Sequence, residues 1–213
     1  MFNYGEQKMI VIIDYGMGNQ RSILNMLYKV GGQAIISSDL DEILRAEKLI
    51  LPGVGAFDHG IQQLANLGLT DLLNRRVIVD KIPILGICLG VQLFTRRSEE
   101  GKLAGLGWID ADTIRFKIPS DSKLKVPHMG WNELHLLQDS KLFKGMYPNP
   151  RFYFVHSYHI SDSCSTEQVI GTTIYGYEFA AVVQKDNIFG TQFHPEKSHK
   201  FGMCLFKNFV ELI

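Results

Sequence analysis

Short, continuous apolar runs in the first half of the chain each lead into a turn that contains glycine. Residues 9–13 (MIVII) precede DYGMGN, residues 48–51 (KLIL) precede PGVG, and residues 83–87 (PILGI) precede Cys88. Runs without polar alternation are typical of strands buried on both faces of a parallel sheet. Such a sheet is therefore the first structural prediction for this chain.

Helical patterns fill the intervals between these runs. Asn19 can cap a first helix, a short helix is expected at 39–45, and one or two helices are expected over 56–80. A further strand is expected at 34–37 and a helix at 89–96. This alternation of strand and helix predicts an α/β fold with a doubly wound, mostly parallel sheet.

The second half of the chain is richer in strand-forming residues. Its β-rich segments are separated by turn residues and should extend the sheet with antiparallel strands. A closing helix is expected at 198–212, where Phe201, Leu205 and Phe209 fall on one face. The expected strand segments are 108–116, 151–160, 178–185 and 187–193.

Composition limits the class of protein. The chain has 213 residues, of which 46% are hydrophobic, so one compact domain over 9–213 is expected after a polar leader at 1–8. The 22 basic and 22 acidic residues balance, which gives no electrostatic reason to expect nucleic acid or membrane binding. Three cysteines without paired spacing describe no disulfide framework, so a cytoplasmic protein is expected.

Cys88 lies in the segment GICLG (86–90), between an expected strand and an expected helix. This is the context of a nucleophile elbow, which usually carries serine in the pattern G-x-S-x-G. Glycines flank the nucleophile because larger side chains would clash in so sharp a turn. The helix N-terminus favours a thiolate, and the N–H of Leu89 is available as one donor to an oxyanion.

A lone cysteine is more often a core residue than a nucleophile. With this composition, however, only about 0.03 cysteines flanked by glycine two residues away on each side are expected by chance. The elbow therefore favours a nucleophile at Cys88. Cys164 and Cys204 lack this setting, and Cys204 is expected in the core.

His194 and Glu196 supply the two other groups that an activated thiol requires, a base and a residue that orients the base. In extended structure, residues i and i+2 project to the same side, and Pro195 between them should exclude helix. We therefore expect Glu196 to contact one ring nitrogen of His194 while Cys88 contacts the other.

An isolated histidine at a strand end is more often a surface residue, but His194 follows an apolar strand and accompanies the cysteine elbow. The remaining histidines form no pattern of metal ligands. His156 and His159 are expected on opposite sides of one strand, so we expect neither a metal site nor a cofactor.

The elbow GICLG together with FHPE resembles the class I, or triad, glutamine amidotransferases. Within that class, further motifs resemble the glutaminase subunits of imidazole glycerol phosphate synthase, over nearly the whole chain. These motifs are DYGMGN (14–19), LPGVGAF (51–57), PHMGWN (127–132), YFVHSY (153–158) and FHPEKS (193–198). The resemblance implies the α/β fold of the class.

The resemblance also implies a reaction. Cys88 would attack the side-chain carboxamide of glutamine, ammonia would leave, and water would hydrolyse the γ-glutamyl thioester, with His194 as base and acid and Glu196 as its orienter. The N–H of Val54 would be the second oxyanion donor. Glutamine would be held by Gly55, Gln92, Glu100, Ser157 and Tyr158.

A partner follows from the same resemblance. Ammonia would pass to a (β/α)8-barrel subunit that docks over the glutaminase site and forms a heterodimer with this chain. That subunit would make imidazole glycerol phosphate and an aminoimidazole carboxamide ribotide in histidine biosynthesis. The residues that match interface or gate positions are Asn19, Met129, Trp131, Tyr153 and Lys197. For Trp131 alone, simple core packing is an equally ordinary role.

Three alternatives stay open. Arg96 and Arg97 stand where these subunits more commonly carry acidic and small residues. This difference raises the alternative of a paralogous glutaminase that supplies ammonia to a surface-sugar amidation partner. A non-enzymatic binding protein on the same scaffold is disfavoured because the whole triad is present. A stand-alone cysteine hydrolase, such as a γ-glutamyl peptidase, is disfavoured by PHMGWN and YFVHSY.

Overall fold

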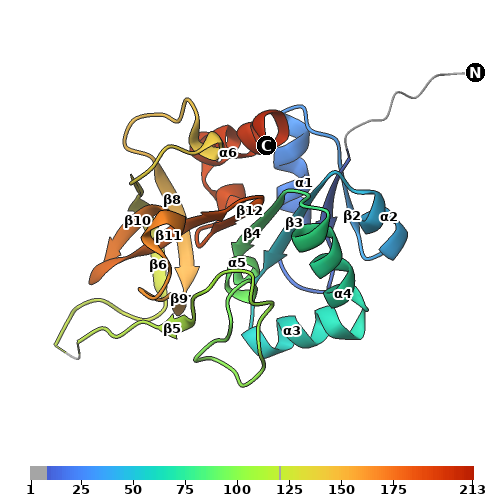
Figure 1. The fold of residues 1–213 in the computed structure, drawn as a ribbon. Coiled ribbons are helices and arrows are strands. Elements are labelled where there is room, and N and C mark those ends of the chain that lie inside the picture. Colours follow the sequence, from blue (N-terminus) through green and yellow to red (C-terminus); the bar gives the residue numbers. More distant parts are fainter. Residues whose placement is uncertain (1–8, 120) are drawn as a thin grey trace, which may run out of the picture.

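The computed structural model describes residues 9–119 and 121–213, so the polar leader expected at 1–8 lies outside the described residues. A ten-stranded sheet runs through this part of the chain, with helices packed on both of its faces (Figure 1). This arrangement confirms the doubly wound α/β fold. None of the helices within the described residues is long and apolar enough to cross a membrane.

The strands at one side of the sheet run parallel in the order β2-β1-β3-β4-β12. Every residue of β1, β3, β4 and β12 is buried. The apolar runs of the sequence are therefore strands covered on both faces, as predicted. The bounds are β1 (Ile10–Ile13), β2 (Ala34–Ser37), β3 (Lys48–Gly53), β4 (Ile84–Cys88) and β12 (Ile188–Thr191).

Helices build the two outer layers. One core cluster packs α2 (Leu40–Arg45), α3 (Phe57–Asn66), α4 (Leu69–Asn74) and α5 (Leu89–Leu93) against the sheet, and α4 continues into the π-helical turn η1 (Arg75–Val79). A second cluster packs α1 (Gln20–Lys29) and α6 (His199–Leu212) against the other face. Asn19 caps α1 as expected, because its side chain accepts the N–H of Ser22 at 3.4 Å.

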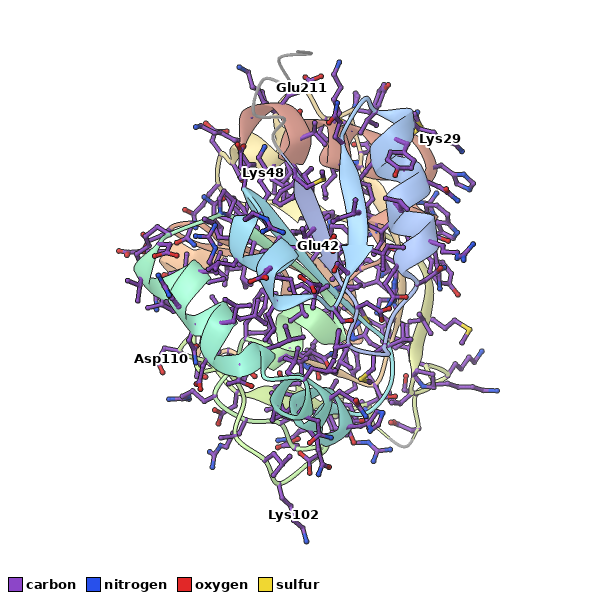
Figure 2. The ribbon with its side chains drawn as sticks, turned by 90° about the vertical axis from the view of Figure 1, so that its right-hand side faces the viewer. Lys29, Glu42, Lys48, Lys102, Asp110 and Glu211 are labelled. Atoms are coloured by element: carbon purple, nitrogen blue, oxygen red, sulfur yellow. The ribbon has the colours of Figure 1, made fainter. Side chains whose placement is uncertain are left out.

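A buried lysine fastens α6 to the sheet. Lys48, at the start of β3, donates to the carbonyl oxygens of Phe209 at 2.9 Å and Val210 at 2.7 Å. Figure 2 shows Lys48 near Glu211, which marks this end of the helix. The last turn of a helix leaves carbonyl groups unpaired, and a cation there stabilises them.

Antiparallel strands extend the sheet beyond β12 in the order β11 (Tyr177–Lys185), β10 (Val169–Tyr175) and β7 (His135–Leu136), which confirms the expected extension. A short strand β9 (Tyr158–Ile160) pairs with β11 and with β5 (Thr113–Arg115). The predicted strand at 108–116 is therefore wrong over most of its length. The N–H of Ile109 bonds to Phe94 and the N–H of Arg96 bonds to Ala111, so this segment pairs with the loop after α5.

Strands β6 (His128–Glu133) and β8 (Arg151–His156) pair in a separate two-stranded sheet, the β6–β8 ribbon. The single strand expected at 151–160 is broken at Ser157 into β8 and β9, which belong to different sheets. The expectation that His156 and His159 face opposite sides is consequently wrong. Both rings pack against Phe116, with centroids 5.2 and 4.6 Å away.

Candidate active site

Cys88 is the last residue of β4 and immediately precedes α5. Its φ of +55° is in the left-handed region, so the backbone turns sharply at the thiol. A Cβ on Gly90 would overlap the carbonyl oxygen of Leu51, and one on Gly86 would lie 2.5 Å from the ring of Phe94. Glycine is thus required on both sides of Cys88 because β3 and α5 pass in direct contact with the elbow.

A cavity of about 400 Å³ opens beside Cys88. Leu89 is the first residue of α5, so its N–H has no acceptor within the helix. The lining includes Cys88, both predicted oxyanion residues and all the predicted glutamine-binding residues, together with Val155 and His156, which the sequence did not indicate. The predicted residues are Val54, Leu89, Gly55, Gln92, Glu100, Ser157 and Tyr158.

His194 and Glu196 form a buried pair, with Nδ1 of His194 2.8 Å from Oε1 of Glu196. The contact between Glu196 and one ring nitrogen of His194 is the expected one, but the backbone between the two residues is not extended. Pro195 begins a 3-10 turn, η4 (Pro195–Lys197), so the expectation that it excludes helix is wrong. Proline is tolerated at the first position of a helix because no hydrogen bond is needed from its nitrogen there.

Charge on the neighbouring groups favours a protonated His194. Burial opposes the imidazolium, but the interactions of the ring with Cys88 and Glu196 outweigh burial and raise the pKa of His194 to about 10. The other ring nitrogen, Nε2, is buried and makes no hydrogen bond of ordinary geometry with any described residue. This nitrogen is therefore available for proton transfer.

Gln92 and Glu100 are tied to the walls of the cavity. Gln92 Nε2 donates to the carbonyl oxygen of Tyr158 at 2.9 Å. Glu100 Oε2 accepts the N–H of Phe57, the first residue of α3, at 2.9 Å. The loop that carries Glu100 is fixed by Asp58, which accepts the N–H of Lys102, and Figure 2 shows Lys102 projecting from the tip of this loop.

Three of the predicted interface residues come together on the ribbon and η4. The ring of Trp131 stacks on His199 at 5.4 Å and meets the edge of Tyr153 at 6.2 Å. The ammonium of Lys197 lies 5.6 Å above the Tyr153 ring. Met129, two residues before Trp131 in β6, is 61% exposed. The fifth predicted residue, Asn19, caps α1.

Two further residues contact His194 and Cys88, and sequence analysis did not single them out. Ser198 Oγ donates to the carbonyl oxygen of His194 at 2.6 Å and accepts the N–H of Tyr153 at 3.0 Å. Gln192 Nε2 lies 3.8 Å from Cys88 Sγ. The available signal was a polar amide inside an apolar strand, two residues before His194. No group of three or more potential metal ligands occurs within residues 9–119 and 121–213.

The fold is that of a class I glutamine amidotransferase. The model of the family described as glutamine amidotransferase class-I matches residues 11–212. A chain in the structure of PurLQS from Thermotoga maritima has a similar fold, with a TM-score of 0.68 and 19% identity, covering 95% of this chain and 97% of that one.

Closer relatives define the family within the class. Imidazole glycerol phosphate synthase subunit HisH 2 of Methanococcus maripaludis is 54% identical over 95% of this chain and 99% of its own length. The protein of the same name from Pseudomonas aeruginosa is 52% identical over 96% of this chain and its full length. The chain therefore belongs to the HisH subunit family of class I glutamine amidotransferases.

Proposed function

We propose that this chain is the glutaminase subunit of an imidazole glycerol phosphate synthase and hydrolyses L-glutamine to glutamate and ammonia for histidine biosynthesis. The observation that carries the proposal is the position of Cys88 in the lining of the cavity, beside the buried pair of His194 and Glu196. The similarity to HisH subunits supports the pathway.

In the first half of the reaction the Cys88 thiolate attacks the carboxamide carbon of glutamine. The tetrahedral oxyanion is stabilised by the N–H groups of Leu89 and Val54, which both line the cavity. The C–N bond then breaks, His194 gives its proton to the leaving nitrogen, and ammonia departs from a γ-glutamyl thioester.

In the second half His194, now neutral, takes a proton from water as the water oxygen attacks the thioester carbon. The C–S bond breaks, glutamate leaves, and the thiolate and imidazolium are restored. Glu196 holds the ring and stabilises its positive charge in both steps, which its 2.8 Å contact supports. Gly55, Gln92, Glu100, Ser157 and Tyr158 hold the substrate from the lining of the cavity.

The partner is a synthase subunit with a (β/α)8-barrel fold that docks as a heterodimer over the ribbon and receives the ammonia. Asn19, Met129, Trp131, Tyr153 and Lys197 belong to this interface, which the exposure of Met129 supports. The complex is cytoplasmic. Residues 9–213 form a single domain, supported by a family match that runs from 11 to 212.

The alternative acceptor, a surface sugar, gains no support from Arg96 and Arg97. Both guanidinium groups pair with Asp112, at 3.0 and 2.9 Å, and Arg96 also pairs with Asp110 at 2.9 Å. The two arginines therefore form ion pairs within the surface loop after α5, and they give no chemical reason to favour a sugar pathway.

The decisive experiment is a glutaminase assay on the chain co-purified with candidate barrel subunits. We expect weak hydrolysis by the chain alone and a stimulation of about 10²–10³ when the ligand-bound partner completes the oxyanion hole. Cys88→Ala should remove hydrolysis and keep partner binding, while Cys204→Ala, a change in α6, should leave both intact. Hydrolysis that survives in Cys88→Ala would end the mechanism.

A further inference from the structure

Gln192 is a buried polar residue that the reaction described above does not use. The residue is 1% exposed, and its backbone N–H donates to the carbonyl oxygen of Ala181 at 2.9 Å. The segment from β12 to His194 thus holds an amide in the interior, where an unsatisfied amide is costly. Its two polar atoms face Gln92 and Cys88.

The orientation of the Gln192 amide follows from its neighbours. The carbonyl oxygen of Tyr158 can only accept, so the side-chain nitrogen of Gln92 must face it, at 2.9 Å. The same nitrogen lies 3.1 Å from Gln192, so the oxygen of the Gln192 amide must be the atom that faces Gln92. The nitrogen of Gln192 is therefore directed at Cys88 Sγ, 3.8 Å away.

Two groups around Cys88 Sγ act in opposite directions. The carbonyl oxygen of Val155, 3.9 Å from the sulfur, can only accept and so favours the thiol. The side-chain amide nitrogen of Gln192 can only donate, and a hydrogen bond donated to the charged form favours the thiolate. The thiolate is the form that attacks glutamine, so the donor from Gln192 acts on the reactive form.

We propose that Gln192 is a positioning residue of the glutaminase reaction, which holds the Cys88 thiolate with its amide N–H and ties it through Gln92 to the Tyr158 carbonyl. This inference rests on the proposed function. The Gln92 amide nitrogen donates both to the Tyr158 carbonyl oxygen at the wall of the cavity and to the Gln192 amide oxygen, and the Gln192 amide nitrogen donates to the sulfur of Cys88.

Alkylation of Cys88 by iodoacetamide in the full-length chain tests the proposal, with the modified cysteine located by mass. At pH 7 we expect Gln192→Leu to react about tenfold more slowly than the wild type, because a hydrogen bond to a charged group is lost. Its rate profile should also move to higher pH. Gln184→Leu is the matched control, since this amide in β11 bonds to Ser140, away from the cavity.

A second variant keeps the proposal testable if Gln192→Leu does not fold. Gln192→Glu keeps the size of the side chain and an oxygen toward Gln92, but it places a carboxylate against the sulfur. Cys88 should react more slowly still, and its profile should move further to higher pH. A profile equal to that of the wild type in folded Gln192→Glu overturns the proposal, as does an unchanged rate in folded Gln192→Leu.

Alkylation needs no glutamine turnover, so the two levels of inference can fail separately. If Cys88→Ala retains glutaminase activity, the proposed function fails and the role of Gln192 falls with it. If Cys88→Ala is inactive and the Gln192 variants alkylate like the wild type, only the role of Gln192 is wrong. Slower alkylation in both Gln192 variants, with Gln184→Leu unchanged, supports it.

Discussion

Cys88 and the opposite wall of the cavity are held by different kinds of structure. Cys88 ends a central strand of the parallel region, where β4 lies between β3 and β12 and the elbow glycines touch their neighbours. The wall, residues 155–158, lies at the end of β8 and the start of β9. Strand β8 pairs with β6 in the ribbon, apart from the parallel strands (Figure 1).

The difference shows which half of the site can respond to a partner. Core packing fixes Cys88, whereas the ribbon exposes Met129 and Trp131 on its outer surface. His194 joins the two halves, because its N–H bonds to the carbonyl oxygen of Tyr153 in β8 at 2.9 Å. A partner that presses on the ribbon would therefore act on the base and the wall and leave the nucleophile in place.

The largest effect is expected from a change at His194, which connects the two halves of the site. Glu196→Gln removes the charge that supports the His194 imidazolium, so the pKa of His194 should fall from about 10. We expect glutamine hydrolysis by the partner-bound chain to drop about 10²–10⁴-fold. Steady-state kinetics measures the drop, with Glu211→Gln at the end of α6 as control. A loss below threefold would contradict the role of Glu196.

Matched glycine substitutions compare the rigidity of the halves. Gly90→Ala forces a methyl group onto the carbonyl oxygen of Leu51, and we expect it to destabilise the fold by about 3 kcal/mol. Gly130→Ala in the ribbon meets no atom within 4 Å and carries only the strain of a φ of +141°, or about 1 kcal/mol. Urea unfolding measures both, and equal losses would remove the proposed difference.

Buried histidines beside the wall make this half sensitive to acid. Burial lowers the pKa values of His128, His156 and His159, so the folded chain binds protons at these rings less readily than the unfolded chain does. The unfolded chain binds protons below about pH 6.5, so stability is fully present above that pH and is lost as pH falls. His156, the ring with the largest lowering of its pKa, should contribute most of this loss. Thermal unfolding at pH 7.5 and 5.5 measures this, and equal midpoints would contradict it.

The smallest expected effect concerns the outer surface of the ribbon. Trp131→Ala removes a ring that is 38% exposed and stacks on His199, and we expect affinity for the barrel subunit to fall about tenfold. Titration calorimetry measures the affinity. Leu137→Ala, an exposed apolar residue that follows β7, is the control. Equal affinities for the two variants would place the interface elsewhere.

The parallel half of the fold could be predicted because its signals are local. The run at 9–13 is apolar without alternation, Asn19 precedes a helical pattern, and the glycines around Cys88 mark a close turn. Each of these signals lies within a few residues of the structure it specifies. The elements from β1 to β4 therefore follow the expected boundaries closely.

The ribbon half could not be predicted in the same way because its structure depends on distant pairing. β6 is defined by its pairing with β8, more than twenty residues later, and the break at Ser157 sends β9 to another sheet. Residues 108–112 look like a strand but bond to the loop after α5. The position of Gln192 beside Cys88 likewise requires two strands to be brought together first.

Glu100 serves two purposes at once, and this limits how the protein can change over evolutionary time. Its carboxylate satisfies the first N–H of α3 and also lines the cavity. A mutation that alters substrate choice at this position would also loosen a helix, so it would be removed by selection even where the new substrate is useful. Divergence of such chains toward other acceptors should therefore begin at the partner surface, with the glutamine pocket inherited unchanged.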